Sequence, residues 1–167
     1  NKVTYFKGKG SFKNSKEIAI TADGEETIIQ SSKVIISTGS EPVSIPGMEF
    51  DEERIISSTG ALSLAELPKK MVVVGGGYIG LEMGSVWSRL GSEVEVIEFL
   101  DHITPGMDKE ISNEFMKILK KQKINFHMQN KVEKIEKTKS GAVVYTKDKN
   151  GNQNQFECDI VLISVGR

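Results

Sequence analysis

Residues 71–98 read MVVVGGGYIGLEMGSVWSRLGSEVEVIE, and this stretch decides the fold. The uncharged apolar run Met71–Val74 predicts a buried strand. The segment Tyr78–Leu90 has apolar residues at helical spacing, and Gly91 after it suits the left-handed end of a helix. Val94–Ile97 then predicts a second buried strand. Two strands joined by a helix form the repeating unit of a parallel sheet.

The turn between the first strand and the helix, Gly75–Gly80, fits the pattern G-x-G-x-x-G. We expect Gly75 to permit the tight turn out of the strand. Gly77 would let the backbone approach a pyrophosphate, and Gly80 would let the helix pack closely on the strand. The helix would present unpaired N–H groups and its positive dipole end to the anion. The turn therefore predicts a dinucleotide site.

A carboxylate at Glu98 follows the glycines at roughly the 20-residue spacing typical of such sites. It could accept hydrogen bonds from the adenosine ribose, and it would repel a 2′-phosphate. The next residues, Phe99–His102, contain no Arg or Lys, which favours NAD(H) over NADP(H). Because flavin domains use a similar loop and acid, the residues alone leave FAD open, as well as a packing turn without ligand.

Composition excludes several classes of function. The 167 residues have a net charge of -1, which predicts no general affinity for nucleic acid or an anionic membrane surface. The apolar runs are too short to span a bilayer, and the first residues do not resemble a signal peptide. Cys158 is the single cysteine, so a disulfide framework within the chain is impossible and a reducing compartment is expected.

Outside residues 71–98, the N-terminal part predicts a small antiparallel β-meander. Val3–Phe6, Glu17–Thr21 and Glu26–Gln30 are prone to form strands, and Asp23-Gly24 suits a hairpin turn. Lys33–Ser37 then predicts a strand buried on both faces.

The remaining segments alternate helix and strand. We expect a helix from Ser57 or Ser58 to about Leu67 and a second helix capped by Asp108. Later strands are expected at residues 124–127 and 160–165, with a β-meander over 132–156 that turns at Asn150-Gly151. The predicted fold class is α/β, a Rossmann-like domain with a parallel sheet, flanking helices and a β-meander.

Several motifs, taken together and in order, resemble those of the flavoprotein disulfide reductases, a pyridine nucleotide-disulfide oxidoreductase family. They are most similar to the dihydrolipoamide dehydrogenases. The motifs are Ile36–Pro42, Gly75–Trp87, Pro105–Ile111 and Val161–Arg167. The resemblance covers nearly the whole chain.

The resemblance implies two cofactors and two domains. Residues 1–52 would be the C-terminal part of an FAD-binding domain, a β-meander and return strand. Residues 53–167 would be an NAD-binding domain whose last strand re-enters the FAD domain. Gly166 would lie near the nicotinamide and Val132 beside the adenine. The other implied NAD contacts are Gly75, Gly76, Gly77, Tyr78, Ile79, Gly80, Leu81, Glu82 and Glu98, and the implied FAD contacts are Gly10, Thr38, Gly39 and Ser40.

The resemblance also implies an activity for the parent protein. Such enzymes oxidise protein-bound dihydrolipoamide through a redox disulfide and FAD, and they reduce NAD to NADH. Partners would be the lipoyl domains of 2-oxo acid dehydrogenase complexes and a second copy, in the bacterial cytoplasm or alternatively the mitochondrial matrix. The alternatives are another flavin disulfide reductase, an NADH oxidase, or a non-catalytic nucleotide-binding module.

The chain departs from that family in ways that predict no catalytic residue in this segment. The family's redox cysteine pair and its His–Glu acid/base pair are absent from the sequence, so we expect the chain alone to be inactive. Cys158 lies between Glu157 and Asp159, whose charges would raise the thiol pKa. His102 and His127 have no spaced Cys or His partner, and no metal site is expected.

Overall fold

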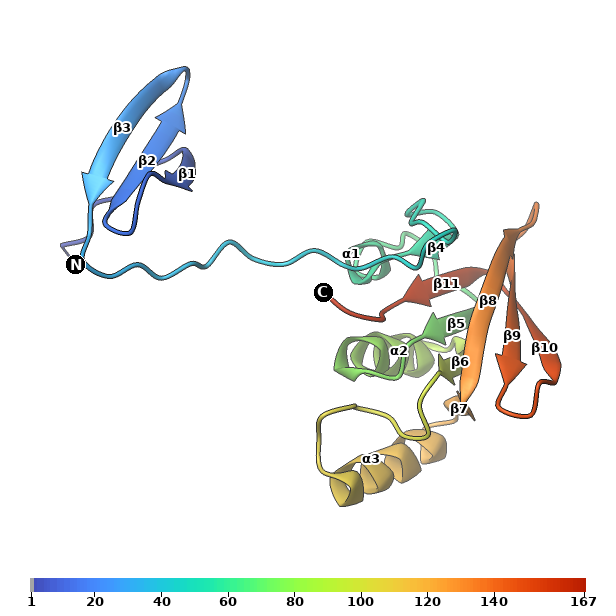
Figure 1. The fold of residues 1–167 in the computed structure, drawn as a ribbon. Helices are drawn as coiled ribbons and strands as arrows, with labels where there is room; N and C mark the ends of the chain where they lie inside the picture. Colours follow the sequence, from blue (N-terminus) through green and yellow to red (C-terminus); the bar gives the residue numbers. More distant parts are fainter. Residues whose placement is uncertain (1) are drawn as a thin grey trace. The chain divides into compact units, whose positions relative to one another are not determined.

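The computed structural model describes residues 2–167, which form two compact units, Asn1–Gly39 and Ser40–Arg167 (Figure 1). Residues 40–52, which the sequence assigns to the first domain, pack in the second unit. The side chains of Ile45, Met48 and Phe50 explain this, because they join an apolar cluster there. Each unit is described by itself.

The first unit is an antiparallel sheet of β1 (Lys9–Phe12), β2 (Glu17–Ala22) and β3 (Glu25–Gln30), in that order. The turn between β2 and β3 has positive φ at both Asp23 (50°) and Gly24 (85°), the geometry of a tight hairpin. This confirms the predicted meander and its turn. The sheet begins at Lys9, whereas residues 3–6, expected as a strand, have no regular structure.

The buried strand predicted at Lys33–Ser37 is wrong. The segment is irregular, and the side chains of Ile35 and Ile36 are 91% and 69% exposed. A strand needs neighbouring strands that hydrogen-bond to its backbone groups. None of the strands described within residues 2–167 pairs with this segment. Apolar composition alone does not supply those neighbours.

The second unit is built on a five-stranded parallel sheet in the order β4-β11-β5-β6-β7. The strands are β4 (Ile55–Ile56), β11 (Ile160–Ile163), β5 (Lys70–Val74), β6 (Glu93–Glu98) and β7 (Asn125–Met128). This sheet confirms the predicted α/β class. β11 lies inside this sheet, hydrogen-bonded to β4 and β5 on its two sides, which explains its continuous burial.

Helices connect the parallel strands where the sequence predicts them. The helix α2 spans Tyr78–Leu90 and ends at Gly91 with φ 119°. The helix α3 spans Lys109–Lys121, and the Asp108 side chain accepts hydrogen bonds from two N–H groups of its first turn. The Ser57 hydroxyl caps α1 as predicted, but α1 covers only Ser58–Ala61 instead of extending to Leu67.

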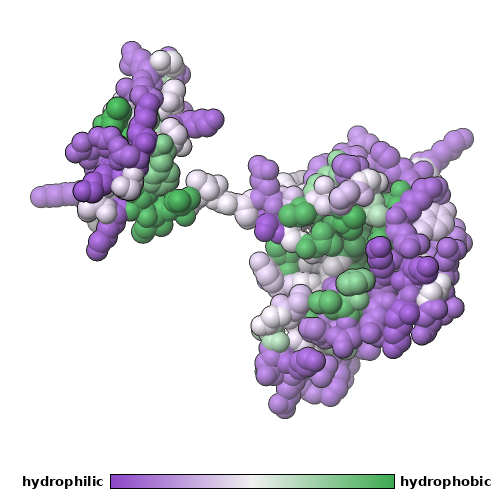
Figure 2. Space-filling model, in the orientation of Figure 1, coloured by the Kyte–Doolittle hydropathy of each residue, from purple (hydrophilic) through white to green (hydrophobic). Residues whose placement is uncertain are grey.

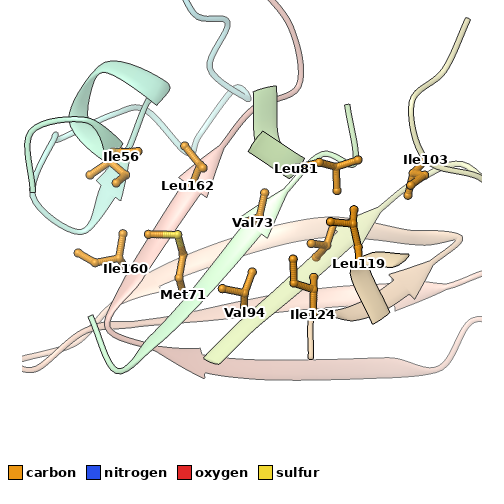
Figure 3. Close-up of a cluster of buried hydrophobic side chains, with 12 residues drawn as sticks. Ile56, Met71, Val73, Leu81, Val94, Ile103, Leu119, Ile124, Ile160 and Leu162 are labelled. Atoms are coloured by element: carbon orange, nitrogen blue, oxygen red, sulfur yellow. The ribbon is translucent and has the colours of Figure 1, made fainter. Parts of the chain in front are cut away.

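Two apolar clusters hold layers on opposite faces of the sheet. On one face, Leu81 of α2 and Leu119 of α3 pack on Met71, Val73 and neighbouring strand residues (Figure 3). On the other face lies the predicted meander, formed by β8 (Asn130–Lys137), β9 (Ala142–Asp148) and β10 (Gln153–Cys158). The sheet is therefore the middle layer of the second unit, and its carboxyl edge carries the glycine turn.

Candidate functional site

The glycine turn leaves β5 in a conformation that only glycine adopts easily. Gly75 has a φ of 103°, and a Cβ on it would lie 2.6 Å from the carbonyl oxygen of Ser164. Its N–H donates to the carbonyl of Ile97 in β6 at 2.9 Å. The first glycine is therefore required by both its dihedral angle and the closeness of β11.

The start of α2 fits an anion. No side chain in the described part of the chain caps this helix, whose N-cap is Gly77, and the first backbone bond comes from Leu81 N–H to the Gly77 carbonyl at 3.1 Å. The N–H groups before Leu81 therefore have no helical partner. A Cβ added to Gly77 would have no described atom within 4 Å, so it would project into the open space that a pyrophosphate needs.

Gly80 has the opposite environment. A Cβ there would lie 3.0 Å from Val73 Cγ1, and it would collide with the Gly75 carbonyl oxygen and the Ser164 hydroxyl. Gly80 therefore permits the close packing of α2 on β5 and on the end of β11. The three glycines have three different physical roles, as the motif predicts.

Glu98 ends β6 beside the turn, and its side chain is 7% exposed. Its carboxylate accepts a hydrogen bond from the Gly76 N–H at 2.6 Å and another from the Leu100 N–H at 2.8 Å. Since a carboxylate can accept about four hydrogen bonds, capacity remains for a ribose hydroxyl. Glu98 thus contributes to the shape of the turn as well as to its charge.

Two cavities open at the carboxyl edge of the sheet, and Gly77, Pro105, Ser164 and Val165 line both of them. The larger has a volume of about 500 Å³, and its lining includes Glu98 and Val132. The smaller has a volume of about 200 Å³, and its lining includes Tyr78 and Gly166. Exposed apolar residues gather on this side of the second unit, close to the end marked C in Figure 1 (Figure 2). Two apolar compartments joined at a glycine turn fit a dinucleotide, whose two halves are joined by a pyrophosphate.

Most of the predicted NAD contacts are brought together here. Gly75, Gly77, Tyr78, Ile79, Glu98, Val132 and Gly166 line the two cavities, while Gly76, Gly80 and Leu81 are buried directly behind them. Glu82 is exposed and borders a separate hollow beside α3.

The predicted FAD contacts are divided between the units. Gly10 lies in β1, and Thr38 and Gly39 lie at the end of the first unit, where all three are exposed. Ser40 belongs to the second unit, where its carbonyl and hydroxyl accept hydrogen bonds from the Arg167 guanidinium at 2.8 and 3.0 Å.

Sequence reasoning did not identify three contributors to this edge. The hydroxyl of Ser164 lies 3.1 and 3.2 Å from the carbonyl oxygens of Val74 and Gly75. Arg167 places a positive charge at the smaller cavity, and Thr104 borders the same cavity from the loop before α3. Ser164 could have been predicted from the sequence, because it directly follows a buried parallel strand and the carboxyl ends of such strands meet at one edge of the sheet.

Cys158 and His127 lie away from the two cavities, because neither residue is in their linings. Burial raises the pKa of the Cys158 thiol to about 12, and the charge of Asp159 acts in the same direction, so the predicted direction is confirmed. His127, which looked isolated, lies with Nε2 2.5 Å from the Glu95 carboxylate and its ring against Phe156. Within residues 2–167, no three His, Cys, Asp or Glu side chains are grouped to hold a metal ion.

Comparisons with known proteins identify the family of the chain. The family model described as pyridine nucleotide-disulphide oxidoreductase matches residues 1–167. Over 169 residues the chain is 49% identical to dihydrolipoyl dehydrogenase 1, mitochondrial, of Arabidopsis thaliana, covering 100% of this chain and 33% of that protein. It is 52% identical over 170 residues to dihydrolipoamide dehydrogenase of Chaetomium thermophilum, covering 100% and 34%. The chain therefore spans about a third of the length of these relatives.

Solved structures are similar as well. LpdA from Mycobacterium tuberculosis is 25% identical with a TM-score of 0.80, over 95% of this chain and 35% of that one. The HOCl-induced flavoprotein disulfide reductase RclA from Escherichia coli is 30% identical with a TM-score of 0.73, over 96% and 35%. None of the helices described within residues 2–167 has the length and apolar character needed to cross a membrane.

Proposed function

Because the chain belongs to the pyridine nucleotide-disulphide oxidoreductase family, we propose that its second unit binds NAD(H). The main support for this proposal is that Gly77 lines both cavities and that Glu98 lines the larger cavity. In this proposal the adenosine occupies the cavity lined by Glu98 and Val132, and the nicotinamide half occupies the cavity lined by Gly166.

The residues of the chain would bind and orient the dinucleotide. The free N–H groups at the start of α2 hold the pyrophosphate, and the absence of a Cβ at Gly77 permits its approach. Glu98 accepts a hydrogen bond from the adenosine ribose and repels a 2′-phosphate, which favours NAD over NADP. When bound, the nicotinamide supplies the hydride chemistry, while the protein supplies orientation and electrostatics.

We propose that the parent protein is a dihydrolipoyl dehydrogenase, which oxidises protein-bound dihydrolipoamide through a redox disulfide and FAD with reduction of NAD. The relatives named dihydrolipoyl or dihydrolipoamide dehydrogenase support this. In that parent, Gly10, Thr38, Gly39 and Ser40 would contact FAD, and Glu82 would lie near the nicotinamide. The lipoyl domains of a 2-oxo acid dehydrogenase complex would be its partners, and the enzyme would be a homodimer.

The compartment proposed is a reducing one, the bacterial cytoplasm or the mitochondrial matrix. The single buried thiol at Cys158 and the mitochondrial names of two relatives support it. The chain alone is expected to be inactive, because its sequence contains one cysteine and no second cysteine to form a redox disulfide.

A second candidate is a different reductase of the same family. It is favoured by the 47% identity over 169 residues to leghemoglobin reductase of Glycine max, which covers 100% of this chain and 32% of that protein. Both candidates use the same dinucleotide site, so they differ in the final electron acceptor and not in the role of this segment.

Calorimetric titration of the 167-residue chain with NADH, NADPH and FAD tests the proposal. We expect NADH to bind more tightly than NADPH, and Glu98→Ala to reduce this difference by about tenfold. Glu93→Ala is the matched control, because Glu93 is an exposed glutamate at the opposite end of the same strand. Equal affinity for NADH and NADPH in the unmutated chain would contradict the proposed preference for NADH. Tighter binding of FAD than of NADH at this site would contradict its assignment as an NAD site.

A further inference from the structure

Thr104 has a backbone conformation that its side chain disfavours. Its φ is 50°, in the left-handed region, where a β-branched residue is rare. The residue is also buried, with 4% of its surface exposed, in the loop between β6 and α3. Such a conformation persists only where surrounding contacts hold it in place, and residues of this kind cluster at functional sites.

A buried hydroxyl pair provides the holding contact. The Oγ1 atom of Thr104 lies 2.8 Å from the Oγ atom of Ser112, and Ser112 is 1% exposed. Ser112 is fixed in the first turns of α3, where its N–H donates to the Asp108 carbonyl at 2.9 Å. The hydroxyl pair therefore ties the loop to the beginning of a well-formed helix.

The held conformation directs the Thr104 N–H at the glycine turn. This N–H donates to the carbonyl oxygen of Gly76 at 2.8 Å, while the N–H of Gly76 donates to the Glu98 carboxylate at 2.6 Å. A Cβ added to Gly76 would lie 3.3 Å from Ile103, which shows how closely the loop follows the turn. Both polar backbone groups of Gly76 are thus fixed by residues outside the turn.

We infer that Thr104 and Ser112 are positioning residues for the dinucleotide, which hold Gly76 so that Gly77 and the start of α2 face the pyrophosphate before it binds. The inference rests on the proposed function. Glycine-rich turns have high conformational entropy when free, and a turn ordered in advance loses less of it on binding. Thr104 lines the smaller cavity and not the cavity assigned to adenosine, so we expect its loss to weaken binding of the pyrophosphate-bearing part of the ligand more than binding of adenosine.

The test compares ADP-ribose, which carries a pyrophosphate and a second ribose, with adenosine, which lacks both. The 167-residue chain is labelled with ¹⁵N and titrated with ADP-ribose and with adenosine, followed by NMR. Thr104→Val keeps the shape of the side chain but removes the hydroxyl, and Ser112→Ala removes its partner. For both variants we expect ADP-ribose to bind about tenfold more weakly and the dissociation constant of adenosine to stay within about twofold.

Two further variants separate positioning from general damage to the fold. Thr104→Ser keeps the hydroxyl and should restore the affinity for ADP-ribose. Thr104→Gly lacks the hydroxyl and frees the backbone at position 104, so it should bind ADP-ribose at least as weakly as Thr104→Val. Peak dispersion in the amide spectra and the thermal midpoint show whether each variant is folded.

The outcomes distinguish this inference from the proposed function. Failure of the unmutated chain to bind ADP-ribose would remove the proposed function, and the inference with it. Normal ADP-ribose binding by Thr104→Val, or an equal loss for ADP-ribose and adenosine, would overturn the inference alone. So would a Thr104→Gly variant that binds ADP-ribose as tightly as the unmutated chain, because the hydroxyl pair would then have no part in the effect.

Discussion

The carboxylate of Glu98 accepts a hydrogen bond from the backbone N–H of Gly76 at 2.6 Å, which joins the end of β6 to the turn after β5. The residue expected to select the cofactor is therefore also part of the scaffold of the turn. Its substitution should change both affinity and stability, and the next prediction separates the two effects.

We predict that Glu98→Gln lowers the free energy of unfolding by about 1–3 kcal/mol and narrows the preference for NADH over NADPH. The amide keeps one oxygen acceptor, so one of the two backbone N–H groups now bonded to the carboxylate becomes unsatisfied. Urea unfolding without ligand measures the first effect, and titration with both nucleotides measures the second. An unchanged NADH/NADPH ratio in a folded variant would contradict the assigned selectivity.

We predict that Gly77→Ala impairs NADH binding, whereas Gly80→Ala impairs the stability of the fold. A Cβ at Gly77 has no described atom within 4 Å, whereas a Cβ at Gly80 would collide with the Gly75 carbonyl and press on Val73. We therefore expect Gly77→Ala to keep its stability within about 1 kcal/mol but to lose NADH binding, and Gly80→Ala to lose about 1–3 kcal/mol of stability. Thermal unfolding and NADH fluorescence are the measurements. A Gly77→Ala variant that binds NADH normally would exclude a pyrophosphate at this glycine.

Cys158 should react slowly with thiol reagents in the folded chain. Burial raises the pKa of its thiol to about 12 from an ordinary value of 9.0, so almost no thiolate is present at pH 8. We expect modification by a chromogenic disulfide to be at least about a hundredfold slower in the folded chain than in urea. Because the folded pKa is the higher one, this thiol stabilises the fold fully below pH 9 and progressively less as the pH rises toward 12. Rapid folded-state modification would contradict the buried position.

Asp51 should make stability depend on acid pH. Burial opposes its ionisation, but N–H groups of Glu53, Ile55 and Arg54 and the ammonium of Lys137 outweigh burial and lower its pKa from 3.8 to about 2. The folded pKa is depressed, so the stabilisation is present above pH 4 and is lost as the pH falls toward 2. We expect Asp51→Asn to cost about 1–2 kcal/mol at pH 7 and almost nothing once the pH is well below the folded pKa of about 2. Urea unfolding of both chains across this range measures the difference, and a cost independent of pH would refute the assignment.

Local rules predicted the central part of the fold well. The strand, glycine turn, helix and acid of residues 71–98 form as expected, since each boundary has its own signal, such as Gly91 at a positive φ. The same holds for the Asp108 cap of α3. These features depend on interactions between residues that are close together in the sequence, so they can be predicted from short sequence patterns.

Pairing between distant segments was harder to predict. Residues 33–37 and 160–163 both appear as buried strands in the sequence, yet only the second has partners, because β4 and β5 hydrogen-bond to its two sides. Both segments contain a run of consecutive apolar residues, Val34–Ile36 and Ile160–Ile163, and that shared feature could not distinguish them. The contribution of Thr104 was missed for a related reason, since its position depends on a hydroxyl of α3 and a carbonyl of the glycine turn.

The shared border of the two cavities at Gly77 has a consequence for inhibitor chemistry. A small compound seated in either compartment would bind weakly by itself. A short bridge across the shared border, which Gly77, Pro105, Ser164 and Val165 form, would tether two such compounds, and the second would then bind at a high effective concentration. A neutral bridge would also need no phosphate, which would allow such a molecule to enter cells where a natural nucleotide cannot.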